Sequence, residues 1–323
     1  MKEIQMYKGA QRILETCAGL KSGEKVLILT DFLKEPIGRI LADAAIDKGA
    51  EVVLMIMPPR ELDGQEPPDV AATALKGADL ILTPVARSVT HTNAIKDAIA
   101  AGSRGIMLSA FVPEQLISGG IFADFEAQRP LCEKVAKLLE KAVSARLTTP
   151  AGTNLVFDLS NRKGNAHPGI AMKSGQITTV PNIEASVSPV EGKTEGMLVG
   201  DGSIPYYEIG VLTAPVYMKV KDGRVVDIQG GTQANTIAGM MAAQDDPNVY
   251  NIAQLAFGLN PLCSMSGVML DDEGVYGTAH IGIGTSTLLG GKIKTKMHFD
   301  ILMWKPTLEL DGNVVLKDGE WRL

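Results

Sequence analysis

Short apolar runs alternate with helical stretches over residues 1 to about 145. Four of the runs are bounded by charged or turn residues, as buried parallel strands are. They are KVLILT (25–30), EVVLMIM (51–57), DLILTP (79–84) and RGIML (104–108). Helices are predicted over 37–48, in a short segment after the loop 58–69, just before Gly102, and over about 122–143. This alternation predicts a Rossmann-like α/β fold with a doubly wound parallel sheet.

The second half of the chain changes to alternating polar and apolar residues, a pattern typical of antiparallel hairpins. The predicted hairpins cover residues 146–160, residues 216–231 around Asp222-Gly223, and residues 307–323 around Asp311-Gly312. One or two helices are expected in this half, near 233–244 and 248–257. The pattern therefore predicts an α+β fold rich in antiparallel strands.

The change of pattern near residue 145 is the predicted domain boundary. A chain of 323 residues is too long for one ordinary core, so two domains are expected. We predict a Rossmann-like α/β domain over 1–145 and a catalytic α+β domain over 146–323. Hydrophobic residues at 45% and charged residues at 21% are typical of globular chains.

Charge and cysteine content exclude several classes of protein. A net charge of −6 argues against a nucleic-acid partner, which favours a basic surface. No apolar run approaches the roughly 20 residues of a membrane span, and the N-terminal residues lack the pattern of a secretory signal. Cys17, Cys132 and Cys263 have no paired spacing. Buried thiols in a cytoplasmic protein are therefore expected.

The loop after the first predicted strand argues against a nucleotide site. It reads DFLKEPIG, whereas a phosphate-binding turn is rich in glycine and opens a helix. The Gly-rich stretches at 229–231 and 282–291 lack the strand-to-helix setting. We therefore expect no dinucleotide cofactor.

The segment GTAHIGIGTSTLLGGKIKTKMHFDILM (277–303) holds two of the four histidines. His298 and Asp300 are two residues apart, so on a strand they share a face. His280 lies in a second strand-like run, and the Gly-rich segment between the runs allows the two strands to pair. Two imidazoles and one carboxylate form an open site for non-haem Fe(II), or a zinc–water site. The alternative is that each histidine is an ordinary hydrogen-bonded residue.

Four motifs carry a resemblance to known enzymes. They are PNIEASVSP (181–189), NIAQLAFGLNP (251–261), GTAHIGIG (277–284) and MHFDILM (297–303). They resemble the aminopeptidase T/S family of metallopeptidases and its relative, the 2,5-dihydroxypyridine 5,6-dioxygenases. The resemblance spans most of the chain and implies two domains, with a metal site in the second. Together with the apolar, Met-rich second half, it also suggests a homo-oligomer.

The resemblance implies a set of metal ligands. At one position this chain departs from the peptidases, and that departure favours the dioxygenase. His280, His298 and Asp300 match the two histidines and one aspartate of the dioxygenase, and Glu184 matches a carboxylate ligand of the peptidases. The bridging glutamate of the peptidases falls at Gln254, and a neutral amide does not offset the repulsion of two dications. The resemblance therefore implies a mononuclear site. The loop between its two histidines is shorter than in the dioxygenase.

Three functions remain open at this point. The first is an Fe(II) dioxygenase that cleaves a small hydroxylated heteroaromatic ring, with Glu184 as the proton acceptor or a further ligand. The second is a metallohydrolase of peptides or small amides that uses Zn(II), Mn(II) or Co(II), like a leucyl aminopeptidase. The third is a binding protein, which the open ligand set disfavours because structural zinc sites are closed.

Five other polar residues are weaker candidates. We expect His91 near a helix cap, His167 in an exposed loop, and Glu273 in an acidic turn close enough to His280 to support it. Tyr206 and Tyr207 are expected at a pocket or an interface.

Overall fold

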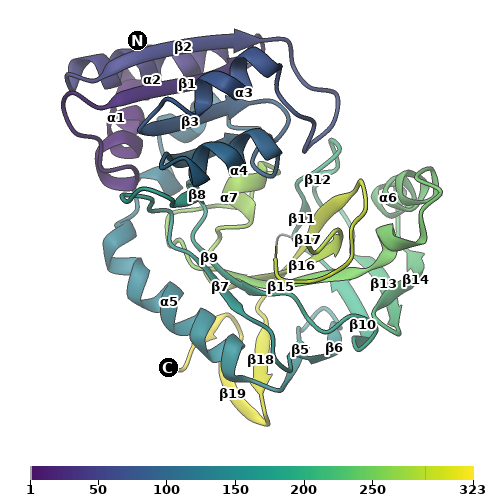
Figure 1. Ribbon diagram of the computed structural model, residues 1–323. Helices are drawn as coiled ribbons and strands as arrows, with labels where there is room; N and C mark the ends of the chain where they lie inside the picture. Colours follow the sequence, from purple (N-terminus) through teal and green to yellow (C-terminus); the bar gives the residue numbers. More distant parts are fainter. Residues whose placement is uncertain (1, 288) are drawn as a thin grey trace. The chain divides into compact units, whose positions relative to one another are not determined.

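The computed structural model describes residues 2–287 and 289–323 and divides into two compact units (Figure 1). Unit 1 comprises residues 1–125 and 167–182, and unit 2 comprises residues 126–166 and 183–323. The predicted single boundary near residue 145 differs from this division in two ways. The helix after residue 125 lies in unit 2, and the chain returns to unit 1 to add one more strand to its sheet.

Unit 1 is built on a five-stranded parallel sheet with the order β2-β1-β3-β4-β8. Its strands are β1 (Lys25–Asp31), β2 (Glu51–Met57), β3 (Leu80–Val85), β4 (Arg104–Ser109) and β8 (Ile177–Thr179). Its helical elements are α1 (Lys2–Arg12), η1 (Ile13–Cys17), α2 (Glu35–Asp47), α3 (Asp69–Leu75), α4 (Asn93–Ala100), η2 (Pro113–Leu116) and η3 (Gly120–Phe122). The four predicted strands are confirmed to within a residue or two. Two of them, β3 and β4, are buried along their whole length, which explains why their sequences are continuous apolar runs.

One partly buried ion pair ties the start of β4 to the segment before β1. The guanidinium of Arg104 donates to both carboxylate oxygens of Glu24, at 2.9 and 2.7 Å, and its Nε donates to the carbonyl of Ala18 at 2.8 Å. Burial opposes ionisation of Glu24, but the hydrogen bonds from Arg104 outweigh it and lower the pKa of the carboxyl. A bidentate, charge-assisted pair of this kind fixes the geometry of both partners.

Unit 2 contains a long helix and two larger sheets. The helix α5 (Phe125–Lys141) leads into an eight-stranded sheet with the order β14-β13-β10-β6-β5-β18-β19-β20. Its strands are β5 (Ser144–Thr148), β6 (Asn154–Asp158), β10 (Glu195–Gly200), β13 (Val216–Lys221), β14 (Arg224–Gln229), β18 (Thr307–Leu310), β19 (Asn313–Lys317) and β20 (Glu320–Trp321). The predicted hairpins at Asp222-Gly223 and Asp311-Gly312 are confirmed as β13–β14 and β18–β19.

The second large sheet of unit 2 has five strands in the order β17-β16-β15-β9-β7, and we call it the site sheet. Its strands are β7 (Gly164–His167), β9 (Glu184–Val187), β15 (Ile252–Gly258), β16 (Thr278–Gly284) and β17 (His298–Trp304). The remaining elements are the small hairpin β11 (Ser203–Ile204) and β12 (Gly210–Val211), with α6 (Thr232–Ala242), η4 (Pro247–Tyr250) and α7 (Met269–Asp272). No helix in the described residues combines the length and apolar character that crossing a bilayer requires.

The prediction of a helix over 248–257 is wrong. Residues 247–250 form a short 3-10 turn, and residues 252–258 form β15, in the middle of the site sheet. Every residue of β15 is buried, so the strand shows no alternation of polar and apolar positions. An apolar run of this length does not distinguish a buried strand from a buried helix by its period.

One face of the site sheet is entirely apolar and packs into the core. It carries fully buried side chains on neighbouring strands, among them Leu255, Phe257, Ile281 and Ile301. The packing is tight, because a Cβ on Gly200 of β10 would lie 2.3 Å from the Ile301 side chain. The opposite face is therefore the one on which polar side chains gather.

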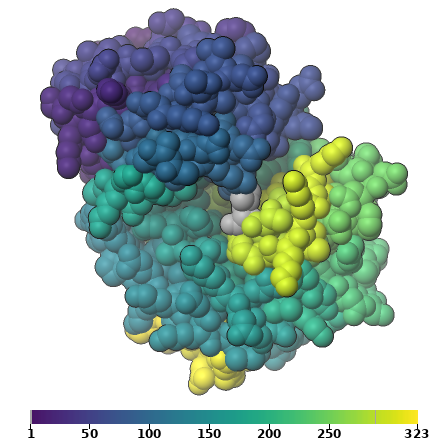
Figure 2. All heavy atoms as spheres, viewed as in Figure 1, coloured from purple at the N-terminus to yellow at the C-terminus, as the bar shows by residue number. Residues whose placement is uncertain are grey.

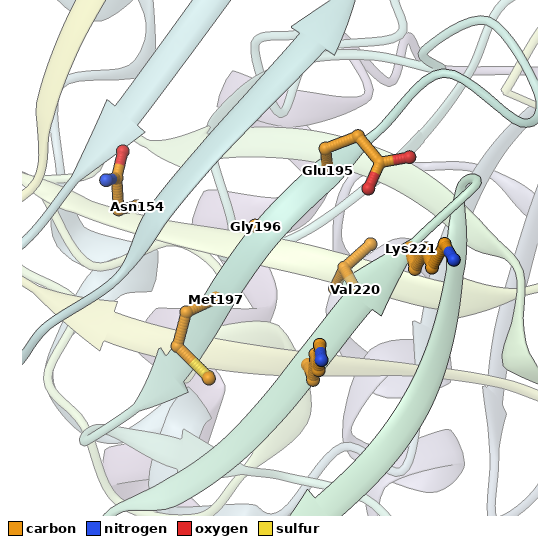
Figure 3. Close-up of a pocket in the computed structure, with 7 residues that line it drawn as sticks. Asn154, Glu195, Gly196, Met197, Val220 and Lys221 are labelled. Carbon is orange, nitrogen blue, oxygen red and sulfur yellow. The ribbon is translucent and has the colours of Figure 1, made fainter.

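The outer face of the eight-stranded sheet is hollowed over β6, β10 and β13 (Figure 3). The hollow encloses about 450 Å³ and is lined by Asn154, Glu195, Gly196, Met197, Lys219, Val220 and Lys221. Its lining includes no histidine and a single carboxylate. The hollow therefore lacks the set of imidazole and carboxylate ligands that a metal ion needs.

Candidate active site

Strand register places the three predicted metal ligands on one face of the site sheet. In the antiparallel pair β16–β17, Gly282 lies opposite Asp300, and Gly284 lies opposite His298. Paired residues and residues two apart on a strand share a face. His280, Asp300 and His298 therefore project from the same face, and the predicted pairing of their two strands is confirmed.

The strands β15 and β9 add two more polar side chains to this face. Gln254 lies opposite Gly282, Ala256 lies opposite His280, and Glu184 lies opposite Gly258. The side chain of Glu184 thus reaches His280 across β15, where the intervening residues are only alanine and glycine. These small residues leave room for a carboxylate to approach the imidazole.

The side chains form two imidazole–carboxylate pairs. Nε2 of His280 lies 3.4 Å from Oε2 of Glu184, and Nε2 of His298 lies 3.6 Å from Oδ1 of Asp300. Among residues 2–287 and 289–323, no group of three or more His, Cys, Asp or Glu side chains is already arranged to hold a metal ion. His280 and Asp300 are buried, while about a quarter of the His298 side chain is exposed. Solvent or substrate therefore reaches the cluster beside His298.

A backbone contact fixes the orientation of the more exposed imidazole. Nδ1 of His298 lies 2.9 Å from the carbonyl oxygen of Thr285, in the segment that follows β16. A carbonyl accepts hydrogen bonds only, so Nδ1 carries the proton and Nε2 is left with a lone pair in the neutral ring. The yellow-green atoms of the segment that joins β16 to β17 lie at the surface in Figure 2. His298 thus presents a ligand nitrogen at the accessible side of the cluster.

A tyrosine and a glutamate complete the site from segments outside the sheet. The hydroxyl of Tyr206 lies 2.9 Å from Oδ2 of Asp300 and 2.9 Å from Oε1 of Glu273. Both contacts have the geometry of donation from the hydroxyl, which has one hydrogen, so at any moment Tyr206 donates to one of the two carboxyl groups. Burial, with the negative charges of Asp300 and Glu184, raises the pKa of Glu273 well above its usual value. The neutral form of Glu273 is thereby favoured, which directs the Tyr206 hydrogen toward Oδ2 of Asp300.

The second carboxylate of the cluster is held in a similar way. The amide Nε2 of Gln254 donates to Oε1 of Glu184 at 3.3 Å, while Oε2 of Glu184 faces His280. Gln254 is buried, so this long hydrogen bond is shielded from solvent. A neutral donor at this position satisfies Glu184 without adding charge to the cluster.

A glycine makes room for the cluster. An added Cβ on Gly282 would lie 2.8 Å from Cβ of Gln254, 2.9 Å from Cε1 of His298 and 3.0 Å from Oδ1 of Asp300. Any side chain at residue 282 would therefore occupy the space in front of the imidazole and the carboxylate.

The electrostatics of the cluster favour charged forms of its members. Burial alone would lower the pKa of His298 and raise that of Asp300, but their mutual attraction reverses both effects. The pKa of His298 is raised, and the pKa of Asp300 is held below its usual range. Burial likewise opposes the charge of His280, but Glu184 and Asp300 raise its pKa. The positive charge that the two imidazoles can carry is therefore offset by the negative charge of two carboxylates.

The donor set suits a divalent cation of borderline hardness. Oδ1 of Asp300 and Nδ1 of His280 are buried and have no hydrogen-bond partner in the described structure. An orphaned buried carboxylate oxygen, beside an imidazole nitrogen with a free lone pair, matches the ligands that Fe(II), Mn(II) and Zn(II) take in proteins. Two ligands of one such ion lie roughly 3–3.5 Å apart, close to the 3.6 Å between His298 Nε2 and Asp300 Oδ1. The donor atoms of His298 and Asp300 therefore fit the type and spacing that a metal ion takes.

The remaining candidates are His91, His167 and Tyr207. His91 is exposed in the turn before α4, where the cap is the neighbouring Thr92, whose hydroxyl accepts from the backbone N–H of Ile95. His167 ends β7 and is half-buried, although the sequence suggested an exposed loop. Tyr207 stacks at a tilt against Tyr206, with ring centroids 6.1 Å apart. No sequence pattern indicates the Tyr206–Asp300 contact, because these residues are far apart in the chain.

A buried set of imidazoles and carboxylates on one face of a sheet is typical of an enzyme site. Comparison with known proteins gives its family. The family model of 2,5-dihydroxypyridine 5,6-dioxygenase matches residues 5–322. The chain therefore belongs to the 2,5-dihydroxypyridine 5,6-dioxygenase family.

Individual relatives agree with this assignment. A curated 2,5-dihydroxypyridine 5,6-dioxygenase from Pseudomonas putida is 25% identical over 262 residues, which cover 77% of this chain and 73% of the relative. The solved structure of the 2,5-dihydroxypyridine dioxygenase from P. putida KT2440 has a TM-score of 0.83 at 21% identity, covering 99% of this chain and 97% of that one. AmpT from Thermus thermophilus shares the fold, with a TM-score of 0.71 at 15% identity over the whole of both chains.

Proposed function

We propose that this enzyme is an Fe(II)-dependent dioxygenase that opens the ring of 2,5-dihydroxypyridine or a close analogue between carbons 5 and 6. The observation that carries the proposal is the clustering of His280, His298 and Asp300 on one face of the site sheet, in a chain of this family. The curated relative from P. putida carries the same activity in its name. The hydrolase alternative is supported only by the fold shared with AmpT at 15% identity.

Each residue of the cluster has a distinct task in this proposal. His280, His298 and Asp300 hold the metal, and Glu184 takes the proton from a ring hydroxyl of the substrate. Bound Fe(II) supplies the redox chemistry that lets molecular oxygen react with the ring. Glu184 suits a proton acceptor because Gln254 holds one of its oxygens and leaves Oε2 directed into the cluster.

A single metal ion per chain is part of the proposal. A second dication needs a further carboxylate to offset repulsion between the ions. Gln254 stands on β15, opposite Gly282 and next to Glu184, and offers only a neutral amide there. We also propose a cytoplasmic homo-oligomer, and the burial of Cys17, Cys132 and Cys263 agrees with the cytoplasmic part of this proposal.

Oxygen consumption tests the proposed reaction. Protein purified without oxygen and loaded with Fe(II) is mixed with 2,5-dihydroxypyridine in an oxygen electrode, with loss of the substrate followed by absorbance. We expect about one oxygen molecule consumed per substrate, since a dioxygenase places both oxygen atoms in the product. Protein loaded with Zn(II), which has no redox chemistry, is the control and should consume none. Metal-dependent hydrolysis of a peptide or amide panel without oxygen consumption would contradict the proposal.

A further inference from the structure

We propose that Tyr206 is a positioning residue that restricts Asp300 to one metal-binding oxygen. The inference rests on the proposed metal site and adds a role for a residue outside the site sheet. The Tyr206 hydroxyl lies 2.9 Å from Oδ2 of Asp300, while Oδ1 of the same carboxylate is buried and has no hydrogen-bond partner. One oxygen is occupied by a donor, and the other is directed to the imidazole of His298.

The phenol is itself held from its other side. Glu273 lies 2.9 Å from the Tyr206 hydroxyl and is buried. A tyrosine that bonds two groups at once has its ring position and its hydroxyl direction fixed by both. Tyr206 is therefore a rigid donor rather than a side chain that samples several orientations.

The backbone around Tyr206 is anchored to β17, which carries Asp300, and to the segment that carries Glu273. The backbone N–H of Gly202 donates to the carbonyl of Leu302 on β17 at 3.0 Å, just before β11. The hydroxyl of Ser203 on β11 donates to Asp272 at 2.6 Å, and Asp272 directly precedes Glu273. The carboxylate of Asp272 also accepts from the backbone N–H groups of Ser266 and Gly267. The tyrosine segment is thus attached both to the strand that carries Asp300 and to the segment that carries Glu273.

The restriction has a consequence for the metal. A carboxylate that binds through both oxygens takes two coordination positions, whereas one that binds through a single oxygen takes one. With Oδ2 bonded to Tyr206, Asp300 offers only Oδ1, which leaves one more position for substrate or oxygen. The sheet supplies the ligands, and Tyr206 determines how many positions Asp300 occupies.

Replacement of Tyr206 by phenylalanine removes only the hydroxyl. We expect Tyr206→Phe to bind Co(II), a spectroscopic probe, about 10–100-fold more weakly than the parent chain, as loss of a group that orients a ligand does. We also expect a changed Co(II) absorption spectrum, because Oδ2 becomes free to bind. Tyr217→Phe is the matched control, since Tyr217 is an exposed residue on β13 and loses the same atom.

Several outcomes separate this inference from the proposed function. Wild-type Co(II) affinity and spectrum in Tyr206→Phe, with binding lost in His298→Ala, would overturn the role of Tyr206 alone. Undiminished binding in His298→Ala would instead overturn the metal site. If Tyr206→Phe fails to fold, a crystal structure of the metal-loaded parent decides. We expect Asp300 bound through Oδ1 with Tyr206 on Oδ2, and two bound Asp300 oxygens, or a tyrosine on the metal, would overturn the proposal.

Discussion

At the scale of single residues, the cluster owes its geometry to a few side chains whose neighbours are small. Ala256, Gly258 and Gly282 lie between or beside the polar groups on the site sheet. A side chain at residue 282 would meet His298 and Asp300, and one at residue 258 would meet the backbone of Gly274 and Val275. The histidines and the aspartate were predictable because i and i+2 on a strand share a face, and because the two strand-like runs were joined by a Gly-rich segment.

Removing one proposed ligand tests the cluster directly. We expect His298→Ala and Asp300→Ala to lose metal binding, measured as bound metal per chain by elemental analysis after dialysis. The secondary structure, measured by circular dichroism, should remain, because the parallel sheet of unit 1 contains none of the cluster residues. His91→Ala is the control, since it removes an exposed imidazole of unit 1, which contributes none of the three predicted ligands. A ligand variant that retains full metal content would show that the residue is not a ligand.

The close approach of the cluster side chains to Gly282 gives a second prediction. A Cβ there would lie 2.9 Å from Cε1 of His298 and 3.0 Å from Oδ1 of Asp300. We expect Gly282→Ala to lower kcat/KM about 100-fold, as displacement of catalytic groups by a fraction of an ångström or more does. Gly239→Ala is the matched control, because Gly239 lies in α6 with nothing within 4 Å of its added Cβ. That control should keep its activity and gain about 0.5–1 kcal/mol in the free energy of unfolding.

At the scale of elements, the strands and hairpins that could be predicted are those whose pattern of apolar and turn residues lies within the element itself. The strands of unit 1 are continuous apolar runs with charged ends, and Asp-Gly turns mark two hairpins of unit 2. The strand β15 was mistaken for a helix because it is buried on both faces. The contact between Tyr206 and Asp300 was not predictable, because it depends on where a loop lies relative to a strand far along the chain.

The Glu24–Arg104 pair predicts a pH dependence at this scale. Because the folded chain lowers the pKa of Glu24, the pair stabilises above the unfolded pKa of about 4.3 and loses this effect as pH falls through the folded value. We expect Glu24→Gln to cost about 1–3 kcal/mol at pH 7, measured by urea unfolding. The difference from the parent chain should shrink steadily below about pH 4, where Glu24 becomes neutral in both states. A difference that is the same at low and neutral pH would contradict this account.

At the scale of the whole molecule, metal binding should be coupled to stability. A ligand that binds only the folded chain raises the free energy of unfolding by about 2.7 kcal/mol at 100 times its Kd. We expect Fe(II) or Co(II) to raise the thermal midpoint of the parent chain, measured by calorimetry without oxygen. Asp300→Ala should show no such rise, because this variant lacks Oδ1 of Asp300, the buried oxygen that has no hydrogen-bond partner in the described structure. An equal rise in both chains would place the stabilising ion elsewhere.

The return of the chain to unit 1 also affects how the protein is synthesised. The strand β8 pairs with β4, but residues 126–166 of unit 2 are translated between them. At about 5–20 residues per second, β4 waits on the ribosome for roughly 4–14 s before its partner emerges. During that interval the edge formed by Gly105, Ile106 and Met107, which is buried in the finished protein, is unpaired. An unpaired edge of this kind readily joins another strand, so the nascent chain should depend on chaperones most strongly before β8 leaves the ribosomal exit tunnel.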